Sequence, residues 1–309
     1  MIRLLVALCV ALALGGCAQH RVAIEGKGLP PRIELTEVPF FPQQDYQCGP
    51  AALATMLAQR NIAVTPDDLV GQVYLPSRKG SLQVELVAAS RAAGLLVYPL
   101  QPRLETVLTE VAAGNPVLVL QNLAFDRWPQ WHFAVVVGYD LAQQQIILRS
   151  GTTRRWVGSF AQFERSWAKG ERWAILTLPP SRLPATAQEL RWLQAASDLE
   201  QTQGVQQASV AYRTAVERWG SALSWFALGN SQYAGRQFGE AERAFRQAII
   251  ADGHFAPAWN NLAQLLAERG CTAGAVVARR CASQVGAQSG DVEASSRPAH
   301  ACGAPPRCP

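Results

Sequence analysis

A repeated motif in the last third of the chain constrains the fold more than any other feature of the sequence. The motif Trp-x-x-Leu-Gly that begins at Trp225 returns 34 residues later at Trp259, with Ala in place of Gly. An earlier tryptophan, Trp192, lies 33 residues before Trp225 and begins a similar pattern. A period of this length is typical of stacked helical hairpins, because only a neighbouring hairpin can cover the apolar face of each unit. The sequence therefore predicts a helical array in this region.

The spacing within this array resembles that of tetratricopeptide repeats. The residues that carry the resemblance are Tyr233, Ala241, Phe245 and Ala248 after Trp225, and Ala208, Tyr212 and Ala215 after Trp192. The resemblance implies an all-α tetratricopeptide-repeat domain over residues 188–285, with about three units and the last one completed by the segment Cys271–Cys281. We expect the aromatic and small residues mainly to pack, and the repeats to recruit a substrate or a protein partner.

A cysteine at a predicted helix start marks a candidate active site nearer the N-terminus. The run from Cys48 to Arg60 is rich in helix formers, and Pro50 falls in the first turn. A helix N-terminus favours a thiolate and is expected to lower the pKa of Cys48. A cysteine nucleophile needs a base, and His132 is the only histidine between His20 and His254.

The surroundings of these two residues suit acyl transfer. His132 opens the apolar run Phe133–Tyr139, which predicts a buried strand and a rigid mount for a base. The backbone N–H of Cys48 would face a developing oxyanion, and Gln43 is placed to supply a second donor. Taken singly, a lone cysteine or histidine is as often an ordinary buried residue.

Together, these motifs resemble papain-like cysteine peptidases of the bacteriocin-processing type, the double-glycine leader peptidases. In that family a glutamine precedes a Cys-Gly-Pro-Ala helix start, and a histidine begins a strand ending in Gly-Tyr/Ile-Asp. Gln43, Cys48 and His132 match its oxyanion donor, nucleophile and base. The resemblance extends over roughly residues 35–178 and implies cleavage after small residues such as Gly-Gly.

One member of the family's catalytic set is missing. An aspartate followed by proline usually orients the histidine from the next strand, but that strand here reads Ile146-Ile-Leu-Arg-Ser150. A hairpin that turns near residues 141–144 would place Ser150 on the same face as His132, so Ser150 is the tentative orienter. Asn122 and Asp140 are alternatives, and Asp140 is better suited to capping the turn.

The rest of this region predicts an α+β papain-like domain over residues 34–179, with an antiparallel sheet. The Pro-rich segment 179–184 then marks the domain boundary. The expected helices are 48–60, 66–74, 81–93, 104–113 and 160–168, and the expected strands are 96–100, 117–121, 133–139, 145–149 and 173–178.

The first residues predict export and lipid anchoring. Arg3 is followed by a short apolar run and by Leu14-Gly-Gly-Cys17, which resembles a bacterial lipobox. Residues 1–16 would form a lipoprotein signal peptide, Cys17 would be lipidated, and residues 17–33 would form a tether. Ala18 in place of Asp indicates the outer membrane of the bacterial envelope, facing the periplasm. Plain secretion is the alternative.

The remaining cysteines predict disulfides in a tail over residues 286–309. In an exported protein the even set Cys271, Cys281, Cys302 and Cys308 suggests two bridges. We favour links from Cys271 or Cys281 to Cys302 or Cys308, since these would fasten the tail over the terminal repeat. Without a Cys-x-x-Cys element, a zinc site is the weaker reading.

Composition excludes other classes of function. Hydrophobic residues make up 49% of the chain, which excludes general disorder, and the net charge of +5 is not gathered into a basic run typical of nucleic-acid binding. We expect no cofactor and no metal. The predicted function is that of a lipid-anchored envelope cysteine peptidase acting on a peptide or protein substrate. The alternatives are a catalytically silent peptide-binding module with a repeat scaffold, and a cell-wall amidase or transglutaminase-like enzyme.

Overall fold

The structure is a computed structural model, and it describes residues 22–24, 28–43, 47–286, 302, 304 and 307–309. The predicted signal peptide and Cys17 lie outside these residues. Among the helices of this described part, none is both long enough and apolar enough to cross a membrane.

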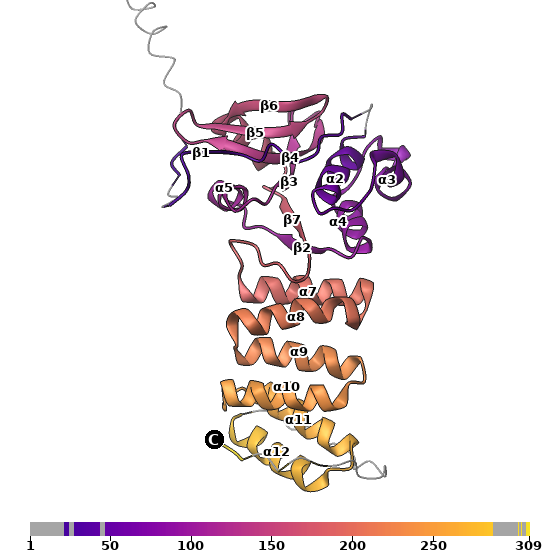
Figure 1. Cartoon of the computed structure of the whole chain (residues 1–309), viewed down its shortest axis with the longest axis vertical. Coiled ribbons are helices and arrows are strands. Elements are labelled where there is room, and N and C mark those ends of the chain that lie inside the picture. Colours follow the sequence, from indigo (N-terminus) through magenta and orange to yellow (C-terminus); the bar gives the residue numbers. More distant parts are fainter. Residues whose placement is uncertain (1–21, 25–27, 44–46, 287–301, 303, 305–306) are drawn as a thin grey trace, which may run out of the picture.

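The N-terminal domain is an antiparallel sheet with helices on both faces (Figure 1). Its strands are β1 (Arg32–Glu34), β2 (Leu96–Pro99), β3 (Val117–Asn122), β4 (Trp131–Asp140), β5 (Gln145–Ser150), β6 (Thr153–Ser159) and β7 (Ala174–Leu178). Its helices are α2 (Cys48–Ala58), α3 (Pro66–Val73), α4 (Gln83–Ala92), α5 (Leu104–Ala112), α6 (Phe160–Lys169) and the short 3₁₀ helix η2 (Pro76–Arg78). The predicted antiparallel sheet is confirmed, and each predicted helix and strand is present with its ends shifted by no more than two residues.

The long central strand β4 organises the sheet. The strand order is β2-β7-β3-β4-β5-β6, and β1 pairs with β4 beyond the end of β3, with Arg32 opposite Asp140. The predicted tether therefore reaches onto the sheet, where the backbone N–H of Val22 also donates to the side chain of Gln144. Strands β1 and β6 were not among the expected elements. β6 is an edge strand with charged residues, which carries little of the apolar signal of a buried strand.

Alternating residues of β3 show how the two faces of the sheet are buried. Val117 and Val119 pack into the cluster that contains α5 and α6, whereas Leu118 and Leu120 pack into the cluster that contains α2, α3 and α4. Because both faces are covered, β3 is buried along its whole length and reads as a continuous apolar run.

In the described part of the C-terminal domain, six helices stack in a column below β2 (Figure 1). They are α7 (Glu189–Gln203), α8 (Val205–Trp219), α9 (Ala222–Ala234), α10 (Phe238–Ala251), α11 (Ala256–Glu268) and α12 (Thr272–Gln284). This domain is all-α, as predicted. The glycine of the repeated motif has a packing role, since a Cβ on Gly229 would lie 2.6 Å from the ring of Phe245.

The two domains share one hydrophobic core. The cluster on the α5 side of the sheet continues into α7, α8 and α9, and the ring of Tyr98 in β2 contacts that of Trp192 in α7 at 6.4 Å between centroids. Arg91 of α4 and Asp198 of α7 form an ion pair at 2.6 Å. The helical column is therefore packed directly on the sheet domain.

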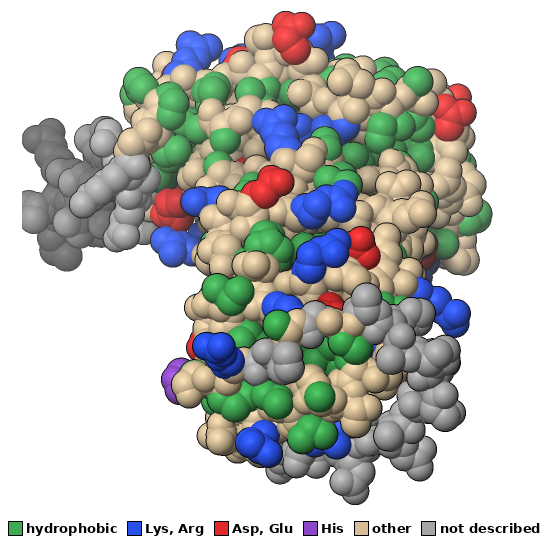
Figure 2. Space-filling view, turned by 60° about the horizontal axis from the view of Figure 1, so that its bottom comes forward, with side chains coloured by type: hydrophobic (Ala, Val, Ile, Leu, Met, Phe, Trp, Pro, Cys, Tyr) green, Lys and Arg blue, Asp and Glu red, His purple; other side chains and the backbone are tan. Residues whose placement is uncertain are grey.

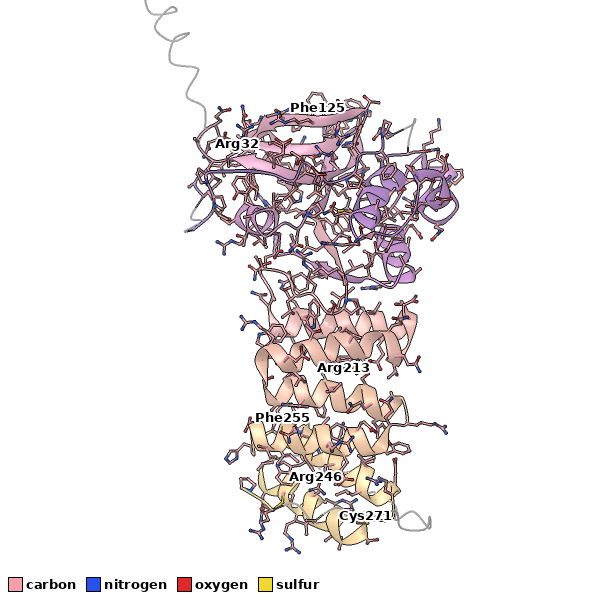
Figure 3. The ribbon with its side chains drawn as sticks, viewed as in Figure 1. Arg32, Phe125, Arg213, Arg246, Phe255 and Cys271 are labelled. Carbon is pink, nitrogen blue, oxygen red and sulfur yellow. A yellow bond between two sulfur atoms is a disulfide. The ribbon has the colours of Figure 1, made fainter. Side chains whose placement is uncertain are left out.

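Two disulfides fasten the end of the chain to the last helical pair. Cys271 is joined to Cys302, and Cys281 is joined to Cys308. Each disulfide therefore joins a cysteine of the helical domain to a cysteine of the tail. Cys271 lies at the lower end of the column, whereas Phe125 lies at the opposite end of the molecule (Figure 3).

Candidate active site

The start of α2 holds Cys48 against the sheet. Gly49 lets α2 lie close to the segment before α4, because a Cβ at that position would lie 2.2 Å from Oγ of Ser81. The rest of the first three turns of α2 is buried under the sheet. Among the described residues, Cys48 is the only cysteine outside a disulfide.

Three backbone N–H groups face the Cys48 sulfur, those of Cys48, Gly49 and Phe133. Strand β4 pairs with β5 only from Val135 onward. The backbone N–H of Phe133 therefore has no partner in β5 and is left to reach the Cys48 sulfur. Burial nevertheless raises the pKa of the Cys48 thiol, and the three N–H groups lower it only in part. The expectation of a lowered pKa is therefore wrong, because desolvation outweighs the favourable helix terminus.

His132 lies one residue before Phe133 in β4 and is buried. Its Nε2 atom is 2.8 Å from Oγ of Ser150, the last residue of β5. Burial lowers the pKa of His132 to about 4. No hydrogen bond is recorded for its Nδ1 atom, nor any between His132 and the Cys48 sulfur, among the described residues. Both side chains are therefore uncharged at neutral pH.

Gln43 reaches the same place from the N-terminal side. Its backbone N–H donates to the carbonyl of Gly151, 3.1 Å away, directly after Ser150. Gln43, Cys48, Phe133 and Ser150 all line one small cavity. Its volume of about 10 Å³ leaves room for roughly one water molecule. Of the four predicted site residues, Gln43, Cys48 and Ser150 thus share a cavity, and His132 joins them through Ser150.

The two alternative orienters have other partners. Oδ1 of Asn122 accepts the N–H groups of Ala124 and Gln130 and so closes the loop between β3 and β4. Oδ1 of Asp140 accepts the N–H of Gln143 and caps the turn between β4 and β5, which is the role expected for it.

Sequence reasoning missed two features around the site. Gln47 directly precedes Cys48, and its side-chain Oε1 is buried with no hydrogen-bond partner among the described residues. A cavity of about 440 Å³ lies beyond Ser150 and is lined by Arg165 and Lys169 of α6. Nothing in a single sequence links α6 to the site, because the sheet alone brings them together. No group of three or more His, Cys, Asp or Glu in the described part of the chain is arranged to hold a metal.

Comparison with known proteins supports a peptidase domain. The model of the Peptidase_C39 like family matches residues 35–175, which include Gln43, Cys48, His132 and Ser150. None of the curated proteins is similar enough in sequence to count as a relative.

Three solved structures are similar to this chain. A C39-like peptidase from Bacillus anthracis is 18% identical, with a TM-score of 0.41, covering 48% of this chain and 98% of that one. A double glycine motif protease from an AMS/PCAT transporter, in complex with its leader peptide, is 20% identical, with a TM-score of 0.35, covering 46% and 91%. The peptidase domain of Streptococcus ComA, a bi-functional ABC transporter of a quorum sensing pathway, is 20% identical, with a TM-score of 0.37, covering 46% and 99%.

The family model matches less than half of the chain. The match confirms the predicted peptidase resemblance at the level of the family. Residues 35–175 of the chain are therefore similar to the C39 peptidases, and they contain the cysteine–histidine site described above.

Proposed function

We propose that this chain is a cysteine peptidase in which Cys48 is the nucleophile and His132 the base. One observation carries the proposal: the Cys48 sulfur accepts the backbone N–H of Phe133, the residue that follows His132, while Nε2 of the imidazole is 2.8 Å from Oγ of Ser150. Nδ1 is then the ring nitrogen left for Cys48. Ser150 is the proposed orienter, in the place of the family's aspartate.

The proposed reaction follows from this arrangement. The Cys48 thiol gives its proton to Nδ1 of His132 as sulfur attacks the peptide carbonyl, and the backbone N–H of Cys48 with the amide of Gln43 stabilises the oxyanion. His132 returns the proton to the leaving amine, and water then hydrolyses the thioester. The small cavity beside Cys48 favours a substrate with small residues, such as Gly-Gly, at the scissile bond.

The proposal extends to the two ends of the chain. Cys17 would carry the lipid that anchors the protein, facing the periplasm, in the outer membrane of a bacterial envelope, and residues 188–285 would act as tetratricopeptide repeats that recruit a substrate or protein partner. On the face shown in Figure 2, Lys and Arg are spread over both domains with acidic side chains between them. This distribution fits a protein partner better than nucleic acid. Loss of palmitate labelling in Cys17→Ala would test the anchor.

A covalent probe for cysteine peptidases tests the catalytic proposal. Without a reducing agent, the two disulfides stay closed and Cys48 is the only described cysteine that can react. We expect labelling and peptide cleavage in the wild type, neither in Cys48→Ala, and nearly complete loss of cleavage in His132→Ala. Gln43→Ala should raise the barrier by about 3 kcal/mol through loss of an oxyanion donor. Undiminished cleavage by Cys48→Ala would exclude the proposal.

A second candidate function is peptide binding without catalysis. It is favoured by the uncharged resting state of Cys48 and His132 and by the absence of a carboxylate bonded to His132 among the described residues. Under this alternative, the wild type and Cys48→Ala bind the same peptides with equal affinity and neither cleaves them.

A further inference from the structure

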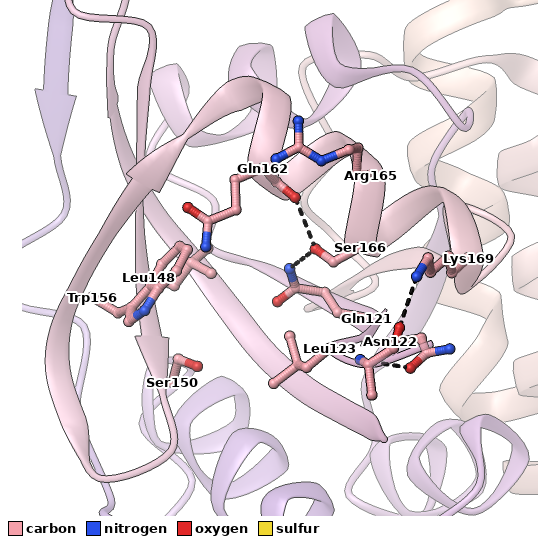
Figure 4. A pocket seen from close by; sticks show the side chains of 11 residues that line it. Gln121, Asn122, Leu123, Leu148, Ser150, Trp156, Gln162, Arg165, Ser166 and Lys169 are labelled. Atoms are coloured by element: carbon pink, nitrogen blue, oxygen red, sulfur yellow. Dashed lines mark hydrogen bonds between the residues drawn. The ribbon is translucent and has the colours of Figure 1, made fainter. Parts of the chain in front are cut away.

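A cavity of the N-terminal domain lies next to the catalytic pair without being part of the Cys48 cavity. It has a volume of about 440 Å³ and lies between α6 and the ends of β3 and β5 (Figure 4). Its lining and that of the Cys48 cavity have one residue in common, Ser150. Ser150 therefore connects the two spaces.

The lining of this cavity is cationic. Arg165 and Lys169 come from α6, and no acidic residue lines the cavity. The Arg165 guanidinium makes no hydrogen bond or ion pair with the described residues. Lys169 donates to the carbonyl of Ala124 at 2.7 Å and lies 3.5 Å from Asp126, whose carboxylate is 83% exposed and is therefore a weak partner.

The neighbouring polar groups leave donors for a ligand. Glu164, the acidic residue of the same helix, is paired with Arg172 and does not line the cavity. Gln162 also lines the cavity, and no hydrogen bond is recorded for its side-chain amide. The cavity thus presents a guanidinium, an ammonium and amide groups, which together are suited to an anion.

Ser150 has one donor that the protein does not use. If Nδ1 of His132 is to take the proton of Cys48, Nε2 must carry its own proton and donate it to Ser150 Oγ. The Ser150 hydroxyl then has its own proton left to donate. No acceptor for that proton is recorded in the described part of the chain, and Ser150 borders the cationic cavity.

We propose that this cavity binds a carboxylate, which accepts the Ser150 hydroxyl proton and supplies the negative charge that the His132–Ser150 pair lacks. The carboxylate belongs to the peptide substrate, as an acidic side chain or C-terminus, or to a small free carboxylate. The inference rests on the proposed function of the site. A carboxylate one hydroxyl away from Nε2 stabilises the imidazolium that forms when Cys48 attacks.

Binding to the full chain with Cys48→Ala tests this without requiring catalysis. Matched peptides that carry either an Asp or an Asn, and either a free or an amidated C-terminus, are titrated by calorimetry. A carboxylate contacted by Arg165 and Lys169 should bind at least about tenfold more tightly than its neutral counterpart. The preference should disappear in the double variant Arg165→Gln/Lys169→Gln. It should persist in Arg172→Gln, a control that removes a cation from outside the cavity.

Labelled acetate separates the two sources. If the peptides show the acid preference, the substrate supplies the carboxylate. Alternatively, the peptides show no preference for the acidic form, while the NMR signal of labelled acetate is broadened by the Cys48→Ala protein and not by the Arg165→Gln/Lys169→Gln variant. In that case a free carboxylate is the ligand. If neither occurs, the inference is wrong, whether or not the protein cleaves peptides. Should the double variant fail to fold, the single variant Arg165→Glu must abolish the same preference.

Discussion

Half-buried Cys48 and buried His132 come from sequence-distant elements, and desolvation shifts their pKa values in opposite directions. Desolvation raises the pKa of the thiol and lowers that of the imidazole to about 4. The resting pair is therefore neutral, and charge separation must accompany attack on the substrate. A site of this kind depends on whatever stabilises the imidazolium at that moment.

The reactivity of Cys48 should therefore follow that of a buried thiol. Because its pKa lies above the ordinary value of 9.0, the rate of carbamidomethylation of the free protein should increase continuously through pH 9. No plateau is expected between about pH 5 and 8, where a thiolate–imidazolium pair would give one. Iodoacetamide kinetics followed by mass spectrometry measures this, with Cys48→Ser as the blank. A low-pH plateau would show that the ion pair exists in the free protein.

His132 should make the fold less stable in mild acid. Its pKa is 6.5 when solvated and about 4 in the fold, so the unfolded chain binds a proton that the folded chain does not. The free energy of unfolding is then unaffected by His132 above pH 6.5, and it falls by up to about 3 kcal/mol as the pH drops toward 4. Urea denaturation between pH 4 and 6.5 should show that the free energy of unfolding depends less steeply on pH in His132→Gln than in the wild type. An identical dependence in the variant would contradict the buried neutral state.

At the scale of elements, the connection between β7 and α7 is held by a buried carboxylate. Glu110 of α5 is fully buried and accepts the backbone N–H groups of Ala185 and Thr186, the hydroxyl of Thr186 and the amide of Asn115. Tyr98 adds a bond from the backbone N–H of Gln188, at 3.0 Å. The segment that leads into the helical column is therefore fixed to the sheet domain.

Replacing Glu110 should destabilise this junction. Glu110→Ala leaves several buried donors without an acceptor, at a cost of about 3 kcal/mol or more in the free energy of unfolding. Glu105→Ala on the same helix serves as the control, because Glu105 makes only a long contact of 3.8 Å with the exposed Arg103. That change should stay within about 0.5 kcal/mol. Chemical denaturation compares the two, and equal effects would show that Glu110 does not hold the junction.

At the scale of the whole molecule, the two ends of the helical column are stabilised by different means. Next to the sheet, α7, α8 and α9 belong to the core of the N-terminal domain. At the far end, α11 and α12 pack in a separate cluster that includes Cys271 and Cys281, to which the two disulfides fasten the tail. Terminal units of a stacked array have an uncovered apolar face, so the far end needs this support most.

Removing both disulfides should therefore loosen one end of the molecule. On the chain-entropy model, loops of 31 and 27 residues contribute about 3–4 kcal/mol each. In Cys302→Ser/Cys308→Ser, hydrogen exchange should accelerate in α11 and α12 while α7 and the sheet keep their protection. Uniform acceleration along the chain, or none, would contradict the division of the column into two parts.

Much of the fold follows from local sequence patterns. The 34-residue spacing of the tryptophan motifs, the Cys-Gly-Pro-Ala helix start and the apolar strand after His132 each depend on residues close together in the chain, and each predicted element is present. Edge strands β1 and β6 lacked such a pattern. Ser150 does lie beside His132, but a regular hairpin closed by Asp140 and Gln145 would have put it on the opposite face. The β-bulge in β4 between Val136 and Gly138 shifts the register by one residue and so brings Ser150 to the face of His132.

Local sequence by itself thus predicted the fold class of both domains and proposed Gln43, Cys48 and His132 as candidates for the site. Only the tertiary structure decided the ionisation of that site, because the pKa of Cys48 depends on its desolvation between α2 and β4 and not on its place at a helix start. Tertiary structure likewise decided that Arg165 and Lys169 line the same cavity as Ser150 and that the column shares the core of the sheet. Burial and distant contacts are properties of the assembled layers, and no spacing along the chain encodes them.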